Sequence, residues 1–503
     1  MNLKKLNFSN TQFSSFLVLL GFCLLFPALS FSQKVGYQIK LKIDGFEEGE
    51  LYLGYFYGDK QYLKDTAYVE ADGRYYFEGN ENLKPGVYMV VLPPDNKFIQ
   101  LLVDENEQWF SVETKLEGLE SNIKIEGSPD NQRFYDYLNF LGSKRPAADD
   151  LKQKIASTDD EKKKIKYENQ LKQIDDAVYK YQNDILTNYP TSLTAAIIKS
   201  NKPVDIPEFE GTDQEKQRLS FYYMRDHWFD NTDMADPRMV RTPFLFKKIQ
   251  HYVEKMTVQH PDSLKIAVDN VLEEAGPAEE TFKYYLIHFL NEYAKSKLVG
   301  MDAVYVHLAN KYYKTGRAPW TDEEQLDKIL ENAKKLEPLL IGKVAPNIQM
   351  EFQDGSPIQL HDFKSRLTVL FFWDPECGHC KKSMPEMVDF AKQYKEKGVS
   401  VFAVCTRLIT RDDEGKFSME EVNKCWTFIE EKEMDVFWNS VDPYHRSRYK
   451  TIYDIRSTPQ VYVLDEDKTI LSKRIGADQL PEVIDHILKV QENKNNEIKI
   501  ENK

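Results

Sequence analysis

The sequence predicts a multidomain protein with an N-terminal antiparallel β-sandwich, a middle all-α domain and a C-terminal α/β domain. Three patterns predict this order: short alternating strands come first, apolar residues at helical spacing follow, and a continuous apolar run then leads into a further helical pattern. The expected domain boundaries are 33–129, 130–337 and 338–491, with a flexible tail at 492–503.

Composition excludes several classes of protein. The chain has 503 residues, enough for about three domains at ~100–200 residues each. Hydrophobic residues make up 41% and charged residues 29%, as in ordinary globular proteins rather than disordered chains or polytopic membrane proteins. The formal net charge is −14, and such an acidic chain lacks the basic footprint that nucleic-acid binding needs.

Residues 1–32 have the plan of a cleaved signal peptide. A positively charged start and a mostly apolar run at 16–28 precede the small residues Ser30 and Ser32. The alternative is a membrane anchor, but a span needs ~20 apolar residues, and Pro27 interrupts this shorter run. We therefore expect export to the periplasm, with no transmembrane segment in the mature chain.

Strand and turn patterns predict the β domain. Tyr37–Ile43 alternates apolar and polar residues, and Asp72-Gly73 is a hairpin turn signal between short apolar runs. No cluster of His, Cys or carboxylate residues stands out in this region. We expect a packing and recognition module without chemistry.

Apolar residues at helical spacing predict the middle domain. Asp130-Asn131 is expected to cap its first helix, and the charged segment 149–181 to form a long solvated helix or a helical hairpin. Residues 282–293 carry an apolar face. The histidines of this domain are scattered, without the paired spacing of a metal site, so we expect no bound metal.

The chemistry is expected in the C-terminal domain. The apolar run 367–373 is typical of a buried parallel strand, and it leads into Cys377-Gly-His379-Cys380 and a helical pattern. Cys377 is therefore expected at a helix N-terminus, where backbone N–H groups and the helix dipole stabilise the thiolate that attacks disulfides. Cys380 lies one turn on and can close a disulfide with Cys377, while the imidazole of His379 can stabilise the thiolate further.

Other uses of a Cys-x-x-Cys pair agree less well with the sequence. A zinc site needs a second pair, which the chain lacks, and haem attachment needs a histidine where Lys381 stands. We therefore expect neither a metal nor a cofactor. An inert structural disulfide is the alternative, although adjacent positions at a helix start favour a strained, reactive bond.

Three separated motifs resemble a known family. They are the segment 372–380 with Pro385 five residues later, the loop 457–459 entering a strand, and the entry segments 341–346 and 354–360. Together they resemble the TlpA/ResA-like branch of thioredoxin-fold thiol–disulfide oxidoreductases in the Gram-negative cell envelope. The CGHC tetrad resembles that of protein disulfide isomerases, and the two upstream regions resemble accompanying modules of unknown function.

The resemblance implies a C-terminal thioredoxin fold in which Cys377 and Cys380 are catalytic. It also implies that Pro459 forms a cis-proline loop, which presents the backbone of Thr458 to the substrate and blocks stray metal binding. By the same resemblance, Trp373, Thr458 and Pro459 are the expected substrate-binding residues.

Two positions depart from the family pattern. Phe371 stands where thioredoxin has a buried Asp that relays protons, so the relay must use another group such as Asp374, Glu376 or water. Glu376 stands where a Trp is common, and its charge beside the thiolate would raise the pKa of Cys377 and oppose His379. We treat Asp374, Glu376 and His379 as residues that tune the active site.

Two further cysteines allow three interpretations. Cys405 ends the strand pattern 399–405, and Cys425 lies in the helical pattern 419–432. The carboxyl ends of strands in α/β sheets face the active-site edge. The pair can form a second, structural disulfide, remain as two buried thiols, or act as a second redox relay.

These patterns predict an exported thiol–disulfide oxidoreductase of the periplasm. Its partners would be protein thiols and disulfides of the envelope, together with a membrane or periplasmic redox partner. One alternative is an envelope binding protein whose thioredoxin-like domain is catalytically passive. A thiol peroxidase is a further alternative, but the peroxidatic pattern wants Thr or Ser where Asp374 stands.

Overall fold

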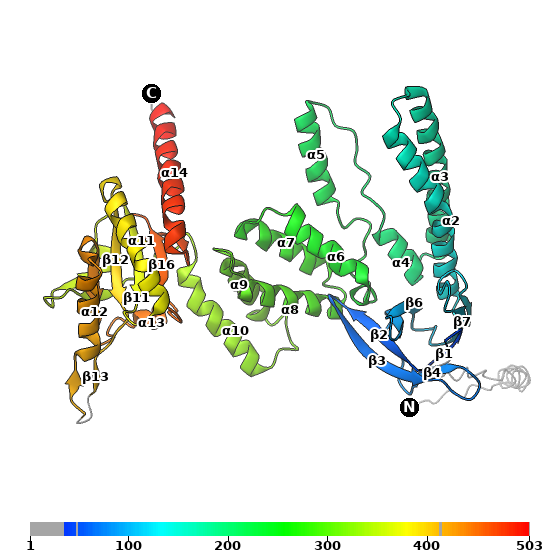
Figure 1. Ribbon diagram of the computed structural model, residues 1–503, viewed down its shortest axis with the longest axis horizontal. Helices are drawn as coiled ribbons and strands as arrows, with labels where there is room; N and C mark the ends of the chain where they lie inside the picture. Colours follow the sequence, from blue (N-terminus) through cyan, green and yellow to red (C-terminus); the bar gives the residue numbers. More distant parts are fainter. Residues whose placement is uncertain (1–34, 47–48, 412–414, 502–503) are drawn as a thin grey trace, which may run out of the picture. The chain divides into compact units, whose positions relative to one another are not determined.

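The computed structural model describes residues 35–46, 49–411 and 415–501 (Figure 1). The expected signal peptide, 1–32, lies outside the described residues. The chain forms two compact units. The first comprises the residues up to Tyr55 together with Gln61–Thr194, and the second comprises Phe56–Lys60 together with the chain from Ala195 onward.

The first unit is built on two four-stranded sheets with the orders β4-β1-β7-β8 and β3-β2-β5-β6. The strands are β1 (Tyr37–Asp44), β2 (Glu50–Tyr57), β3 (Lys60–Tyr68), β4 (Tyr75–Gly79), β5 (Gly86–Leu92), β6 (Lys97–Val103), β7 (Trp109–Lys115) and β8 (Lys124–Glu126). The apolar residues of β1 alternate with exposed or half-buried polar ones, which explains the alternating sequence of this strand.

The predicted antiparallel arrangement needs one correction. β1 pairs antiparallel with β4, and β5 pairs antiparallel with both β2 and β6, but β1 and β7 are parallel, with Ile39 opposite Phe110. Parallel neighbours need a long connection between them. The strands β2 to β6 supply that connection. The alternating pattern of a strand does not indicate whether its neighbour runs parallel or antiparallel to it.

Two long helices, α2 (Pro129–Ser157) and α3 (Glu161–Asn188), complete the first unit as a helical hairpin. The predicted cap at Asp130-Asn131 is wrong by two residues, because Ser128 is the N-cap and its side chain accepts the N–H of Asn131. Pro129 suits the first helical position, where its missing N–H is not needed.

Asn131 instead ties helix α2 to the sheet. Its Oδ1 accepts the N–H of Leu102 at 2.7 Å, and its Nδ2 donates to the carbonyl of the same residue at 2.5 Å. Because β6 is an edge strand, its outward backbone groups lack a strand partner, and Asn131 supplies one. The hydroxyl of Tyr135 donates to Gln100 on the same edge. The expected boundary at 130 therefore does not separate the first helices from the β domain.

A helical region forms most of the second unit before the C-terminal domain, and its first helix, α4, begins two residues before the division at Ala195. Its helices are α4 (Leu193–Ser200), α5 (Asp213–Asp226), α6 (Pro243–His251), α7 (Pro261–Glu274), α8 (Glu279–Lys295), α9 (Asp302–Leu308) and α10 (Glu323–Leu336). The apolar face predicted at 282–293 lies on α8 and is buried in the core of this region.

The C-terminal domain contains a seven-stranded sheet with the order β10-β9-β15-β12-β11-β16-β17. The strands are β9 (Gln349–Glu351), β10 (Pro357–Gln359), β11 (Leu367–Trp373), β12 (Val399–Cys405), β15 (Trp438–Val441), β16 (Gln460–Leu464) and β17 (Ile470–Lys473). A separate two-stranded ribbon is formed by β13 (Thr410–Arg411) and β14 (Phe417–Ser418). β12 pairs parallel with β11 and β15, whereas β16 pairs antiparallel with β11.

Helices cover both faces of this sheet. They are α11 (Gly378–Tyr394), α12 (Glu420–Glu431), α13 (Tyr449–Ile452) and α14 (Leu480–Glu501). Phe371 points into the core formed with α11, α12 and α14, and Phe372 into the core on the opposite face with Tyr449 and Tyr453 of the α13 segment. Burial on both faces explains why β11 is apolar at nearly every position.

The segment expected as a flexible tail, 492–503, is helical as far as Glu501. No proline or glycine follows residue 481, so nothing in the sequence interrupts α14. In the described part of the chain, none of the helices combines the length and the apolar character that crossing a membrane would require.

We predict that Asn131→Ala weakens the attachment of α2 to β6. The variant leaves the N–H and C=O of Leu102 without their partner, which costs about 1–3 kcal/mol for a buried group. Hydrogen exchange of a peptide covering β6 should become at least about tenfold faster, at ~1.4 kcal/mol per factor of ten. Asn139→Ala is the matched control, because Asn139 is exposed on the same helix. Equal exchange rates in the two variants would contradict this role of Asn131.

Candidate active site

Cys377, the cysteine that the sequence predicts to be reactive, lies at the junction of β11 and α11. Cys377 is the N-cap residue of α11, and its Sγ accepts the N–H of Cys380 at 3.3 Å. Asp374 shapes the preceding turn: its Oδ1 accepts the N–H of Glu376 at 2.8 Å, and its carbonyl accepts that of Cys377 at 3.2 Å. A sulfur in the capping position receives the unpaired N–H groups of the first helical turn.

A loop from the far end of the sequence reaches the same sulfur. The Thr458–Pro459 peptide bond is cis, and the carbonyl oxygen of Thr458 lies 3.1 Å from Sγ of Cys377. The antiparallel pairing of β16 with β11 carries this loop to the sheet edge where Cys377 stands. The structure thus brings Cys377, Cys380, Thr458 and Pro459 together.

The two thiols differ in burial and in pKa. Burial alone would raise the pKa of Cys377, but hydrogen bonds from the side chains of Thr458 and Cys380 and from the N–H groups of Cys380 and His379 outweigh it and hold the pKa below its usual value. Burial, followed by the interaction with Cys377, raises the pKa of the Cys380 thiol to about 12. Cys377 is half-buried and Cys380 fully buried, both as free thiols.

The negative charge of Glu376 is offset by neighbouring cations. It belongs to a charge cluster of five side chains: Asp374, Glu376, Arg407, Glu421 and Lys424. Arg407 donates to Asp374 at 2.8 Å and to Glu376 and Glu421 at 2.5 Å each. Lys424 lies 3.1 Å from Glu376 and 2.5 Å from Glu421.

Those two cations decide the electrostatics of Glu376. Lys424 first, and then Arg407, hold the pKa of the Glu376 carboxyl below its usual value, so this group stays ionised. Its charge is offset within the cluster, so the expected increase in the pKa of Cys377 does not prevail. His379 has an exposed side chain, and its backbone N–H contributes to lowering the pKa of Cys377.

Trp373 cannot act as the substrate contact that the resemblance implied. Its side chain is 1% exposed at the end of β11 and packs against Phe428 of α12, with ring centroids 5.3 Å apart. β11 is a central strand with both faces covered, so a residue within it points into a core. Trp373 therefore packs in the core beneath the turn that leads to Cys377. Phe371, at the place of the thioredoxin proton-relay residue, is buried in the same core.

Cys405 and Cys425 form a disulfide, with their Cα atoms 6.2 Å apart. Both residues are fully buried, so the bond is closed to solvent and to large partners. It joins the end of β12 to α12. Arg407 follows Cys405 by two residues and Lys424 immediately precedes Cys425, so this bond sits beside both cations of the charge cluster.

Reasoning from sequence missed Arg407, Glu421 and Lys424 as parts of the site. Their closeness in sequence to the two cysteines could have indicated them. Arg407 follows Cys405 by two positions, and Glu421 and Lys424 precede Cys425 by four and one positions. Within the ranges that the structure describes, no group of three or more His, Cys, Asp or Glu side chains could hold a metal ion.

Each of the three regions of the chain is similar to a known protein family or domain. Residues 341–472 match the AhpC/TSA family, residues 158–336 a domain of unknown function (DUF5106), and residues 37–134 another domain of unknown function (DUF4369). The C-terminal domain has the thioredoxin fold and is ResA-like.

Curated relatives named thiol-disulfide oxidoreductase ResA match this domain. One from Bacillus thuringiensis subsp. konkukian is 43% identical over 70 residues, which is 14% of this chain and 40% of the relative. Another, from Bacillus cereus, is 29% identical over 140 residues, 28% of this chain and 72% of the relative. The chain thus spans about 40% of the length of the first of these relatives.

A solved structure, a domain of a possible thiol-disulfide isomerase from Cytophaga hutchinsonii, is 35% identical. The match covers 31% of this chain and 98% of that domain, with a TM-score of 0.27.

We predict that iodoacetamide labels Cys377 of the reduced protein far faster than Cys380 at pH 6. Only the thiolate reacts, and a group with a pKa of about 12 is almost entirely protonated at that pH. Mass spectrometry of the labelled peptides gives both rates. The Cys377→Ser variant should leave Cys380 almost unlabelled, and comparable labelling of both cysteines would contradict the assignment.

We predict that Lys424→Gln raises the pKa of Cys377 by a few tenths, on the order expected for a solvent-screened charge. Removing this cation leaves the charge of Glu376 less well offset beside the thiolate. The measurement is the pH dependence of thiolate absorbance at 240 nm in a Cys380→Ser background. In a further Glu376→Gln background, Lys424→Gln should leave the pKa almost unchanged. A shift that persists there would show that Lys424 acts on the thiolate directly.

Proposed function

We propose that this protein is an exported thiol–disulfide oxidoreductase that exchanges disulfides with envelope proteins through Cys377 and Cys380. The observation that carries the proposal is the asymmetry of the two thiols. Cys377 is accessible and has a lowered pKa, while Cys380 is buried one turn away with its N–H on the sulfur of Cys377. An attacking and a resolving thiol need this difference.

The reaction follows from that geometry. The Cys377 thiolate attacks one sulfur of a client disulfide and forms a mixed disulfide, while the other client sulfur leaves as a thiolate. Cys380 then attacks the Cys377 sulfur, closes the Cys377–Cys380 disulfide and transfers its proton to the second client thiolate as that group leaves. Two electrons pass to the client, and the reverse sequence oxidises a client dithiol.

Thr458 and Pro459 support docking of the client at this sulfur. Their loop stands against Cys377, with the carbonyl of Thr458 at 3.1 Å, so an extended client segment can lie along it. Trp373 has no part in this docking because it is buried. Asp374 and Glu376 act through the charge cluster, and His379 through its N–H.

Location in the periplasm is part of the proposal. The signal-peptide pattern of residues 1–32 supports export. The buried Cys405–Cys425 disulfide supports an oxidising compartment, because such bonds are rare where thiols are kept reduced. A membrane or periplasmic redox partner would restore the starting oxidation state of the CGHC centre.

Insulin reduction tests the proposed activity. We predict that the mature protein catalyses it with dithiothreitol as reductant, and that Cys377→Ser abolishes catalysis. Cys380→Ser should accumulate mixed disulfides with envelope proteins, visible as adducts that dithiothreitol releases, because the resolving thiol is missing. Cys377→Ser is the matched control and should trap none.

The alternatives give different results. A passive domain would neither reduce insulin nor form adducts. A thiol peroxidase would consume hydrogen peroxide faster than it reduces insulin. Asp374 stands at the peroxidatic Thr or Ser position, and its carboxylate is bound by Arg407 and by the N–H of Glu376.

A further inference from the structure

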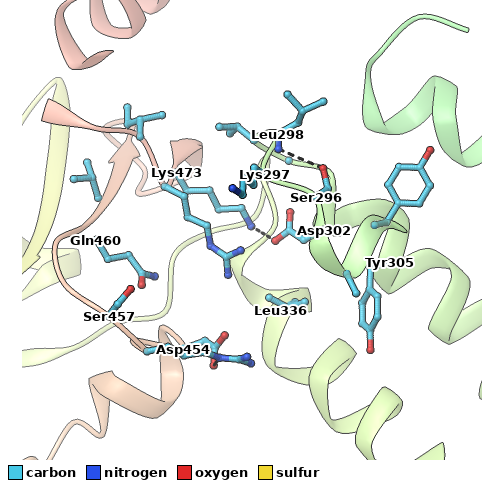
Figure 2. Close-up of a pocket in the computed structure, with 18 of the residues that line it drawn as sticks. Ser296, Lys297, Leu298, Asp302, Tyr305, Leu336, Asp454, Ser457, Gln460 and Lys473 are labelled. Atoms are coloured by element: carbon cyan, nitrogen blue, oxygen red, sulfur yellow. Dashed lines mark hydrogen bonds and ion pairs between the residues drawn. The ribbon is translucent and has the colours of Figure 1, made fainter. Parts of the chain in front are cut away.

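A cavity of about 610 Å³ within the second unit opens beside the redox site. Its walls come from two parts of that unit. One wall is formed by the loop after α8, by α9 and by the last turns of α10, and the other by the loop around Pro459 with the end of β17 (Figure 2). The volume falls within the ~300–1,000 Å³ of ligand pockets. We call this cavity the client pocket.

The client pocket and the active site share the Thr458–Pro459 loop. Pro459 lines the pocket, and the preceding residue, Thr458, has its carbonyl 3.1 Å from Sγ of Cys377. A chain bound along the Thr458–Pro459 loop with its cysteine at Cys377 would therefore contact Pro459, which also lines the pocket.

Polar contacts hold the two walls together. Lys473 is buried and donates to the carboxylate of Asp302 (Figure 2) and to the carbonyl of Leu339. Arg456 donates to Asn332 of α10 at 3.2 Å. These contacts fix the helical wall relative to the cis-proline loop, so the pocket is pre-formed.

The charge of the pocket is opposite to that of the whole chain. Four cationic side chains and two carboxylates line it, in a protein whose net charge is −14. Asp302 is paired with Lys473, and Asp454 with Arg456. In the described part of the chain, Lys297 and Arg474 have no ion pair, and both side chains are exposed.

Two exposed apolar side chains follow Lys297 in the chain. Leu298 is 62% exposed and Val299 39% exposed in the loop that carries Lys297. Neighbouring cations and apolar side chains suit a segment that carries carboxylates and apolar residues together.

We propose that the client pocket binds an acidic polypeptide segment next to the client cysteine, with Lys297 and Arg474 as its specificity-determining residues. This inference rests on the proposed function for the client's chemistry, and it assigns to the helical region a share in client selection. A polypeptide is favoured over a small molecule because the pocket continues the loop on which a client chain would lie. Charge complementarity of this kind selects partners and speeds their encounter.

The first test measures binding of peptides that cannot form a disulfide with the protein. The probes are two fluorescent peptides with serine in place of cysteine, one with three glutamates beside the serine and one with three glutamines. The mature protein should bind the glutamate peptide about tenfold more tightly at low salt, and the preference should shrink as salt screens the charges. The Lys297→Glu/Arg474→Glu variant should lose the preference.

Lys334→Glu is the matched control. Lys334 is exposed on α10, a helix that contributes to the wall, but it does not line the pocket. This variant should keep the wild-type preference. Equal affinity of wild type for the two peptides, or a preference that survives in the double variant, would overturn the proposal. Binding of glutamic acid alone as tightly as the peptide would exclude a polypeptide as the occupant.

Reduction rates separate this inference from the proposed function. Disulfide-bonded versions of the two peptides are compared with hydroxyethyl disulfide, which is small and uncharged. The double variant should reduce the glutamate peptide about tenfold more slowly than wild type, yet reduce hydroxyethyl disulfide at the same rate. Failure of wild type to reduce hydroxyethyl disulfide would overturn the proposed function, whereas loss of peptide selectivity alone would overturn only the role of the pocket.

Discussion

The parallel pairing of β11 with β12 is the constraint on which the site depends. In its register Trp373 lies opposite Cys405, so both strands end at the same edge of the sheet. The chain that leaves β11 enters the turn to Cys377, and the chain that leaves β12 places Arg407 against that turn. Arg407 and Asp374, which are 33 positions apart in the chain, thereby share one charge cluster. The antiparallel strand β16 adds the Thr458 loop from its other side.

The four cysteines of this domain show how position decides chemistry. Cys405 and Cys425 are fully buried and bonded, and they hold β12 to α12. Cys377 stands at a helix N-terminus with N–H groups on its sulfur, which stabilises the charged form. The buried pair thus holds together the two segments that carry the cations offsetting Glu376, while Cys377 is a half-buried free thiol. Within the second unit, Lys297 of the helical region and Arg474 of the C-terminal domain line one pocket together with Pro459 of the cis-proline loop.

Much of the fold followed from local patterns. The continuous apolar run of β11 indicated a strand covered on both faces, and the Cys-x-x-Cys after it indicated a reactive sulfur at the start of a helix. The relative direction of neighbouring strands and the start of helix α2 did not follow from these patterns. An alternating strand is the same sequence pattern whether its neighbour is parallel or antiparallel, as β1 and β7 show. Ser128 rather than Asp130 caps α2, because Pro129 shifts the helix start.

The sequence by itself determined the domain order, the helix N-terminal place of Cys377 and the place of Cys380 one turn on, because these depend on periodicity and on spacing within one segment. Only the tertiary structure decided that Arg407 and Lys424 offset Glu376, that Trp373 is buried, and that Lys297 and Arg474 line one pocket with Pro459. These outcomes depend on contacts between segments far apart in the chain. A charge or an aromatic ring has no fixed role until folding brings its partners within a few ångströms.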